Sequence, residues 1–394
     1  MADSRPDALA ILGFDPLDPA FLADPHAQFR RLAAAGPLQW TPGGLWVTTS
    51  YGLCDRVLRD ARFGHHPPTG GMRRGDTPAQ SFLTLDPPDH TRLRRLVSKA
   101  FGARLIERQR PRIETLVDEL LAGATGRVDL ISAFAYPLPV IVISELLGVP
   151  PEDQERFKGW SDALARGLDP DFLLPEHDLA KRLQARAEFR DYFTELLDRR
   201  RAEPRDDLLS ELVTVRDGGD LLTTDELLAT CILLLVAGHE TTVNLIGNGA
   251  LALLRNPEQL AWFRAHPEAA PAAVEELLRY DPPVQFTMRA ALEDVSLGGA
   301  TLRQGALILL LTSAANRDPA VFPGPDRLDL SRTENRHLAF GLGIHFCLGA
   351  PLARLEGQIA LTRLFQRDVT LATEALAYRD NVVLRGLQSL PVLM

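Results

Sequence analysis

The residues best suited to chemistry lie in one short segment, FGLGIHFCLGAP, from Phe340 to Pro351. Cys347 is one of three cysteines among 394 residues, and His345 precedes it by two positions. The thiol is open to three interpretations: an inert buried group, a nucleophile with His345 as its base, or a metal ligand. Zinc is disfavoured because no second cysteine is near, whereas a thiolate that binds one iron needs a single cysteine. A helix that begins near Pro351 would stabilise the thiolate charge.

A second polar group lies inside the most apolar stretch of the chain, Leu227 to Leu254, where AGHETT places a carboxylate and two hydroxyls at the centre of a predicted helix. One interpretation is structural: Thr241 or Thr242 bonds back to a carbonyl one turn earlier, and Glu240 finds a buried partner. The other is functional: Gly238 opens a groove for a ligand, where Glu240 and Thr241 deliver protons. The residues alone leave both interpretations open.

Basic residues form two faces on the helix predicted for the sequence DPPDHTRLRRLVSKAF. His90 and Arg94 lie one turn apart on one face, whereas Arg92, Arg95 and Lys99 lie on roughly the opposite face. Two basic faces indicate two anionic partners. A solvated helix without a partner is the alternative for the outer face.

The spacing of two opposite charges indicates a last cluster of polar residues. Glu276 and Arg279 are three residues apart, so they share a helix face and can pair. Arg327, in the proline-rich coil FPGPDRLDL, is expected to complete a buried charge cluster with them.

Most of the chain is predicted to be helical. The predicted helices are Pro25–Ala35, Tyr51–Asp60, Pro88–Phe101, Ala103–Ala122, Pro137–Leu147, Pro151–Arg166, Leu179–Arg201, Thr224–Arg255, Pro257–His266, Pro267–Asp281 and Pro351–Phe365. The predicted strands are Leu38–Trp40, Leu45–Thr49, Val295–Leu297, Ala300–Leu302 and Ala306–Leu311, with a hairpin in the tail from Asn381 to Val392. No linker or repeat divides the sequence, so we expect one mainly helical domain over residues 1–394 with a small β part.

Composition narrows the class of protein. A formal charge of -9 argues against nucleic acid as a partner, and three widely spaced cysteines fit a reducing compartment. The acidic, proline-containing start lacks a targeting pattern, so the cytoplasm is expected. Polar residues in the middle of the apolar stretch favour a core helix over a membrane span. The loops 65–81 and 166–177 are open to two interpretations, functional lids or surface disorder.

Taken together, these motifs resemble those of the cytochrome P450 family, the haem-thiolate monooxygenases, in its soluble bacterial, actinomycete-like secondary-metabolism form. The family's cysteine-loop pattern, Phe-Gly-x-Gly-x-His-x-Cys-x-Gly, is matched at Phe340, Gly341, Gly343, His345, Cys347 and Gly349. AGHETT, the Glu276–Arg279 pair and the coil that ends at Arg327 accompany it in family order. The resemblance spans nearly the whole chain and implies the family's fold, a mainly helical triangular prism with a long helix over the haem.

The resemblance implies a role for each motif. Cys347 is implied as the axial thiolate of haem b, and Glu240 with Thr241 as the acid and alcohol that guide protons to bound dioxygen. The residues implied to hold the haem are His90, Arg94, Ala237, Arg289, His345, Cys347 and Gly349. The residues implied to line the substrate pocket are Phe82, Leu234, Gly238, Val284, Phe286 and Leu387. Glu276, Arg279 and Arg327 are implied as structural support for the cysteine loop.

The reaction implied is insertion of one oxygen atom from dioxygen into an apolar small molecule, by default the hydroxylation of a macrolide, terpenoid, steroid-like or similar secondary metabolite. Electrons must come from outside, because the sequence has no flavin or iron–sulfur motif. Arg92, Arg95 and Lys99 are therefore expected to dock an acidic ferredoxin, and no nucleic acid or membrane partner is expected. Two alternatives are a haem sensor without turnover and a peroxide-driven haem enzyme, both disfavoured by Glu240 beside Thr241.

Overall fold

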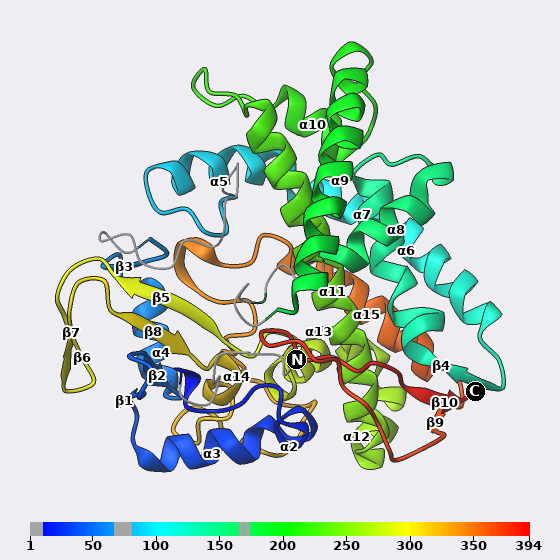
Figure 1. Ribbon diagram of the computed structural model, residues 1–394. Coiled ribbons are helices and arrows are strands. Elements are labelled where there is room, and N and C mark those ends of the chain that lie inside the picture. The colour runs from blue at the N-terminus through cyan, green and yellow to red at the C-terminus, as the bar shows by residue number, and fades with distance from the viewer. Residues whose placement is uncertain (1–10, 67–80, 165–168, 170–173) are drawn as a thin grey trace.

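Helices make up most of the structure, a computed structural model that describes residues 11–66, 81–164, 169 and 174–394 (Figure 1). The helices are α2 (Pro19–Ala23), α3 (Pro25–Ala35), α4 (Tyr51–Arg59), α5 (Asp89–Ala100), α6 (Ala103–Gly123), α7 (Pro137–Leu146), α8 (Gln154–Leu164), α9 (Glu176–Ala202), α10 (Leu208–Thr214), α11 (Thr224–Leu254), α12 (Pro257–Ala265), α13 (Ala270–Tyr280), α14 (Thr312–Ala315) and α15 (Ala350–Phe365). The mainly helical class and the predicted helices are confirmed, with ends that shift by a few residues. The predicted lid loops, 65–81 and 166–177, lie largely outside the described residues.

The long helix α11 runs through the centre of the molecule and extends toward α9 and α10 (Figure 1). Its start is fixed by a capping box: the Thr223 hydroxyl accepts from the Glu226 N–H, and the Glu226 carboxylate accepts from the Thr223 N–H. By length and composition α11 could cross a membrane, but 78% of its most apolar window is buried within the protein. Burial against α7, α13 and α15 therefore explains its apolar composition.

Three small sheets flank the helices, and the largest has the strand order β1-β2-β8-β5-β3 (Figure 1). Its strands are β1 (Gln39–Trp40), β2 (Trp46–Thr48), β3 (Phe63–Gly64), β5 (Thr287–Ala291) and β8 (Leu307–Leu310); the other sheets contain β4 (Arg127–Asp129), β9 (Thr370–Leu371) and β10 (Pro391–Leu393), and β6 (Val295–Leu297) and β7 (Ala300–Leu302). The prediction missed β5, because its sequence TMRAA lacks an alternating apolar pattern. This strand matters for the site, since it carries Arg289 opposite Ile308 of β8.

Other elements differ from the sequence prediction as well: the short elements α2, α14, β3, β4 and β9 were not predicted, nor was α10, and the tail pairs differently. The prediction missed α10, although Asp207 caps it by accepting from the Ser210 N–H at 2.8 Å. The tail does not form a hairpin over Asn381–Val392: Tyr378 pairs with Leu387 in an isolated bridge, and β10 pairs with β4 and β9. A strand joined to partners far along the chain leaves no local signal for its pairing.

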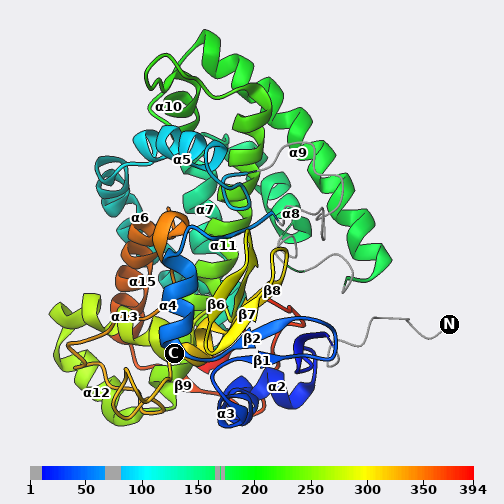
Figure 2. The same ribbon diagram turned by 90° about the vertical axis from the view of Figure 1, so that its left-hand side faces the viewer.

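The apolar side chains form one main core and two satellite cores. The main core surrounds α11 and includes residues of α6, α7, α13 and α15. A second core packs Phe14, Phe21 and Phe29 from the N-terminal region against Phe286, with the Phe14 and Phe286 rings 6.0 Å apart. A third lies between α4 and the large sheet (Figure 2).

Candidate functional site

The cysteine loop is shaped by two glycines and by the start of α15. Gly341 and Gly343 have φ values of 65° and 69°, which side-chain-bearing residues adopt only with strain. A Cβ on Gly343 would also clash with the backbone carbonyl of Leu58 on α4. The loop closes where the Cys347 N–H donates to the Phe340 carbonyl at 3.0 Å. These constraints place Cys347 just before Gly349, the N-cap of α15.

The Cys347 thiol lies in a mixed electrostatic environment. Burial raises its pKa, while hydrogen bonds from the backbone N–H groups of Gly349 and Ala350 and the guanidinium groups of Arg94 and Arg354 act to lower it. The cysteine is free and partly buried. Burial outweighs these groups, so the pKa of Cys347 lies above its ordinary value, and the donors at the helix start and the two cations only reduce that rise.

Four side chains predicted to bind haem propionates converge near this loop from three separate elements. His90 and Arg94 lie on α5, Arg289 on β5, and His345 in the loop itself. The His90 and His345 rings are 4.2 Å apart, and the Arg94 guanidinium donates to the Phe346 carbonyl at 2.7 Å. Arg289 is 7% exposed and donates within its own strand, to the Thr287 hydroxyl and the Met288 carbonyl.

Burial and neighbouring positive charges disfavour the charged forms of these side chains. Burial, Arg289 and His90 lower the pKa of His345 to about 3, and burial lowers that of Arg289 to about 10 although Asp86 opposes the shift. The Asp86 carboxylate already accepts from backbone N–H groups of His65 and His66. Both ring nitrogens of His90 are buried and lack a hydrogen-bond partner among the described residues. The cluster is thus suited to an anionic group that it does not itself contain.

A haem fits the donors that the site offers. Its two propionates are anions that can pair with the cationic cluster and with the orphaned nitrogens of His90, and its iron takes a thiolate ligand such as Cys347. A Cβ on Gly349 would meet nothing within 4 Å, so the backbone there faces open space. The residues present therefore match the cofactor that the sequence pattern predicts.

The centre of α11 lies open on one side. In the run from Leu234 to Leu253, only Ala237, Gly238 and Thr241 are partly exposed. The Thr241 hydroxyl donates to the Ala237 carbonyl at 2.6 Å, and the Thr242 hydroxyl donates to the Gly238 carbonyl at 3.0 Å. A Cβ on Gly238 would touch Ile143 of α7 at 3.7 Å, so its absent side chain leaves room beside α7. These contacts, from each hydroxyl to a carbonyl one turn earlier, are the ones that the structural interpretation of AGHETT predicts.

Glu240 is 2% exposed and has a partner that the sequence did not reveal. The Arg379 guanidinium, 139 residues further along the chain, donates to both carboxylate oxygens at 2.7 and 2.8 Å. Burial acts to raise the pKa of Glu240, but hydrogen bonds and charge from His239 and Arg379 outweigh it and lower the pKa overall. The buried carboxylate is therefore held ionised.

A cavity of about 450 Å³ lies beside this ion pair. It is lined by Asp162, Glu240, Tyr378, Arg379, Asp380, Asn381 and Gln388. These side chains are mostly polar, unlike the apolar lining predicted for the substrate pocket. The cavity is better suited to water than to an apolar molecule.

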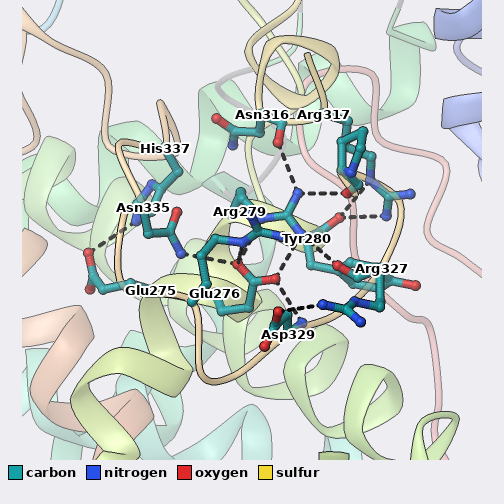
Figure 3. Close-up of polar contacts among 12 residues, drawn as sticks. Glu275, Glu276, Arg279, Tyr280, Asn316, Arg317, Arg327, Asp329, Asn335 and His337 are labelled. Atoms are coloured by element: carbon teal, nitrogen blue, oxygen red, sulfur yellow. Dashed lines mark hydrogen bonds and ion pairs between the residues drawn. The ribbon is translucent and has the colours of Figure 1, made fainter. Parts of the chain in front are cut away.

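The charge cluster around Glu276 and Arg279 differs from the prediction in one member (Figure 3). Arg279, fully buried, donates to Glu276 at 2.7 and 2.8 Å and also to the backbone carbonyls of Asn316, Pro325 and Arg327. The Arg327 side chain is 76% exposed and pairs with Asp329, so the expectation that it completes the buried cluster is wrong. Arg332 takes that place, because its side chain is 8% exposed and donates to Glu276 at 3.1 Å.

A second support joins α13, α15 and the segment before the cysteine. Arg354 donates to Glu275 at 2.7 and 2.8 Å, and its guanidinium stacks 4.6 Å from the Phe340 ring. His337 also contacts Glu275, at 3.1 Å. Burial acts to raise the pKa of Glu275, but Arg354 and His337 outweigh it and lower the pKa to about 2. The cysteine loop is thus held by side chains as well as by its glycines.

The outer face of α5 is already paired with acidic groups of the same chain. Arg92 contacts Glu226, while Arg95 and Lys99 both contact Asp217. The Arg95 and Lys99 side chains remain about half exposed, at 53% and 48%. The anionic partners predicted for this face therefore include Asp217, before α11, and Glu226, in the first turn of α11.

The predicted substrate-pocket residues do not all lie together. Phe82, Leu234 and Leu387 are buried in the main core, and Phe82 also lies under the Arg94 guanidinium. Val284, which is partly exposed, pairs with Leu384 in an isolated bridge. Phe286 instead packs against Phe14 in the second core, so the structure does not bring it to the others.

Three residues of this region were missed or left without a role by sequence reasoning. Arg379 and Arg332 lie in segments without periodicity, so nothing local marks their burial. His239 occupies a position inside AGHETT for which the sequence suggests no function, yet it contacts Glu240 at 3.5 Å. Arg379 and Arg332 pair with residues far away in the sequence, so no spacing pattern marks these pairings.

Comparisons with known proteins agree with this geometry. The family model "Cytochrome P450" matches residues 40–265 and 264–368. The chain is 43% identical over 404 residues to cytochrome P450 monooxygenase PikC of Streptomyces venezuelae, across 97% of this chain and 94% of that protein. It is 43% identical over 392 residues to vitamin D(3) 25-hydroxylase of Pseudonocardia autotrophica, across 95% and 94%.

A solved structure extends the similarity to three dimensions. The cytochrome P450 PksS of the Bacillus subtilis 168 bacillaene polyketide synthase superposes with a TM-score of 0.89 at 40% identity, covering 96% of this chain and 99% of that chain. Sequence and fold thus agree over nearly the full length. The chain belongs to the cytochrome P450 family and is a bacterial P450 monooxygenase.

Proposed function

We propose that this protein hydroxylates an apolar small molecule, such as a macrolide, terpenoid or steroid-like secondary metabolite, as one domain that acts in the cytoplasm. Haem b would be its cofactor, and Cys347 would supply the thiolate that binds its iron. The observation that carries the proposal is the position of Cys347 at the start of α15, beside a cationic cluster that contains orphaned buried nitrogens. The names of two relatives, a cytochrome P450 monooxygenase and a vitamin D(3) 25-hydroxylase, support the substrate class.

Each residue of the site has a task in this proposal. Bound haem supplies the redox chemistry and the binding site for dioxygen. His90, Arg94, Arg289 and His345 hold its propionates, and Ala237 and Gly349 offer it surfaces without bulky side chains. Cys347 supplies the thiolate, which α15 and nearby cations stabilise.

Protons reach the site through α11. Glu240 takes a proton from water in the adjacent cavity when it leaves Arg379, and passes it to the Thr241 hydroxyl, which lies on the partly exposed side of the helix. The Thr241 hydroxyl now donates to the Ala237 carbonyl, so it must turn to deliver the proton.

The substrate is proposed to bind against Leu234, Gly238, Val284, Leu387 and Phe82, which offer apolar surface and no fixed charge. Phe286 has no part in this pocket, because it packs in the second core. Apolar compounds of each class can be screened for their effect on the haem spectrum. Compounds that leave the spectrum unchanged are not substrates.

Electrons are proposed to come from an acidic ferredoxin that docks on α5. The acidic Asp217 now neutralises part of that face, so Asp217→Asn should speed reduction of the iron at low salt, and Arg95→Gln should slow it. Stopped-flow reduction by a surrogate plant-type ferredoxin measures both. Equal rates in the two variants and the wild type would place the docking face elsewhere.

One set of measurements tests the function. The haem-loaded protein should show a thiolate-type band when it is reduced under carbon monoxide, and should form product from dioxygen with ferredoxin and reductase. Product with peroxide alone indicates a peroxide-driven enzyme. A thiolate band without product from either oxidant indicates a haem sensor.

A further inference from the structure

His239 lies next to Glu240 on α11, and the proposed chemistry gives it no task. Its side chain is fully buried. The Nδ1 atom lies 2.8 Å from the hydroxyl oxygen of Ser161 on α8, and the Nε2 atom lies 3.5 Å from a carboxylate oxygen of Glu240. Ser161 is fully buried as well. The imidazole thus bridges a neighbouring helix and the acid.

Packing fixes the orientation of this ring. The Tyr136 ring lies 5.7 Å away and nearly perpendicular to it, at 82°, and the Leu235 carbonyl lies 3.4 Å from Nδ1. A ring enclosed in this way cannot turn without moving its neighbours. A shift of α8 relative to α11 would therefore be transmitted to the imidazole through Ser161.

Glu240 is held from the opposite direction by the C-terminal segment. Arg379 binds both of its oxygens, and the segment is kept in place by the pairing of Tyr378 with Leu387. The carboxylate therefore sits between two holders, His239 from the side of α8 and Arg379 from the tail. Proton transfer requires that the acid leave the second holder.

We propose that His239 is a positioning residue for Glu240, which makes the orientation of the carboxylate depend on how α8 packs against α11. Through Ser161, a correctly placed α8 holds the imidazole where it can keep the carboxylate within reach of Thr241 after Arg379 lets go. Without the imidazole, the acid stays on Arg379 or turns into the polar cavity. The inference rests on the proposed monooxygenase function.

Four variants separate this role from a packing role. His239→Phe keeps the ring volume and removes both contacts, and Ser161→Ala removes only the anchor on α8. Thr242→Val is the matched control, because Thr242 is equally buried on α11 and its hydroxyl bonds only within its own helix. His239→Gln restores a donor and an acceptor and should recover part of the wild-type behaviour.

Two readouts are needed, both on the haem-loaded protein. The first is amide hydrogen exchange in α8, which should speed up roughly tenfold in His239→Phe and Ser161→Ala but not in Thr242→Val. The second is the share of electrons from a surrogate ferredoxin and its reductase that ends in hydrogen peroxide instead of water or product. That share should rise in both variants, with a changed solvent deuterium isotope effect on dioxygen consumption.

The outcomes are distinguishable. If exchange in α8 becomes faster while the peroxide share and the isotope effect stay unchanged, His239 serves only as a packing anchor. That result overturns the inference. A His239→Phe protein that matches Thr242→Val in both readouts also overturns it. A wild-type protein without the thiolate band overturns the proposed function itself, whatever the variants do.

Discussion

The cysteine loop and the centre of α11 are two halves of one site, but they are built by different means. The loop is fixed by its own sequence: glycines at positive φ, a helix start and a hydrogen bond from Cys347 to Phe340 seven residues away. The centre of α11 depends on side chains from distant segments, since Glu240 is held by Arg379 and His239 by Ser161. The backbone of the first half is shaped mainly by local contacts, with Glu275, His337 and Arg354 as further support, whereas the second half depends on contacts between distant segments.

The largest effect is expected at Cys347. Cys347→Ser removes the thiolate, so the thiolate-type band under carbon monoxide should disappear and haem content should fall. The absorption spectrum of the purified protein measures both. Cys231→Ala, at a buried cysteine on α11, is the control and should keep the band; its loss there would mean that the spectrum reports general damage.

Glycine substitutions test whether the loop is fixed locally. Gly343→Ala places a Cβ at positive φ and against the Leu58 carbonyl, so it should lower the free energy of unfolding by more than about 1–2 kcal/mol even without haem. Gly349→Ala has room for its methyl group and should leave the haem-free protein stable. If haem lies against Gly349, the same variant should bind haem more weakly in a titration. Equal stability losses in both variants would contradict this account.

Arg379 tests the dependence of α11 on the tail. Arg379→Gln leaves the buried Glu240 carboxylate without its bidentate partner and should cost about 2 kcal/mol in denaturant unfolding, reduced from a fully buried pair because Arg379 is 23% exposed. Adding Glu240→Gln should recover most of that loss. A double variant no more stable than the single one would show that the pair is not coupled.

Two buried glutamates should give opposite dependences of stability on pH. Burial raises the pKa of Glu356 on α15 to about 8, so its folded state keeps a proton that the unfolded chain releases, and stability falls as pH rises from about 4.5 to 8. Glu356→Gln should remove that slope, worth at least about 1 kcal/mol. The lowered pKa of Glu240 acts the other way, with stability lost as pH falls below its ordinary value. Urea unfolding from pH 8 down to about 3 covers both effects, and parallel curves for wild type and Glu356→Gln between pH 4.5 and 8 would contradict the first.

Sequence reasoning was strongest where the determinants are local. Helical periodicity, the Thr223 capping box and the positions of Gly341 and Gly343 all follow from neighbouring residues, and the structure confirms them. The convergence of α5, β5 and the loop on one cationic cluster came from the family resemblance, because no spacing rule joins Arg289 to His90.

The failures share a physical cause. Arg327 was expected in the buried cluster because it lies in the right coil, but five residues further on Arg332 is the side chain that reaches Glu276. Phe286 follows a proline-rich turn just before β5, and its side chain packs into the N-terminal aromatic core. In each case the deciding contact is made by tertiary packing, which the local pattern does not contain.

The pairing of the tail has a consequence for how the protein is made. Arg385 donates to the Ala23 carbonyl near the start of the chain, β10 pairs with β4, and Arg379 closes on Glu240. These contacts can form only after the ribosome has released residues 379–393. Until then Glu240 on α11 lacks the Arg379 guanidinium that pairs with it in the folded protein. The nascent chain should therefore remain a client for chaperones until residues 379–393 dock, and haem capture should follow that step.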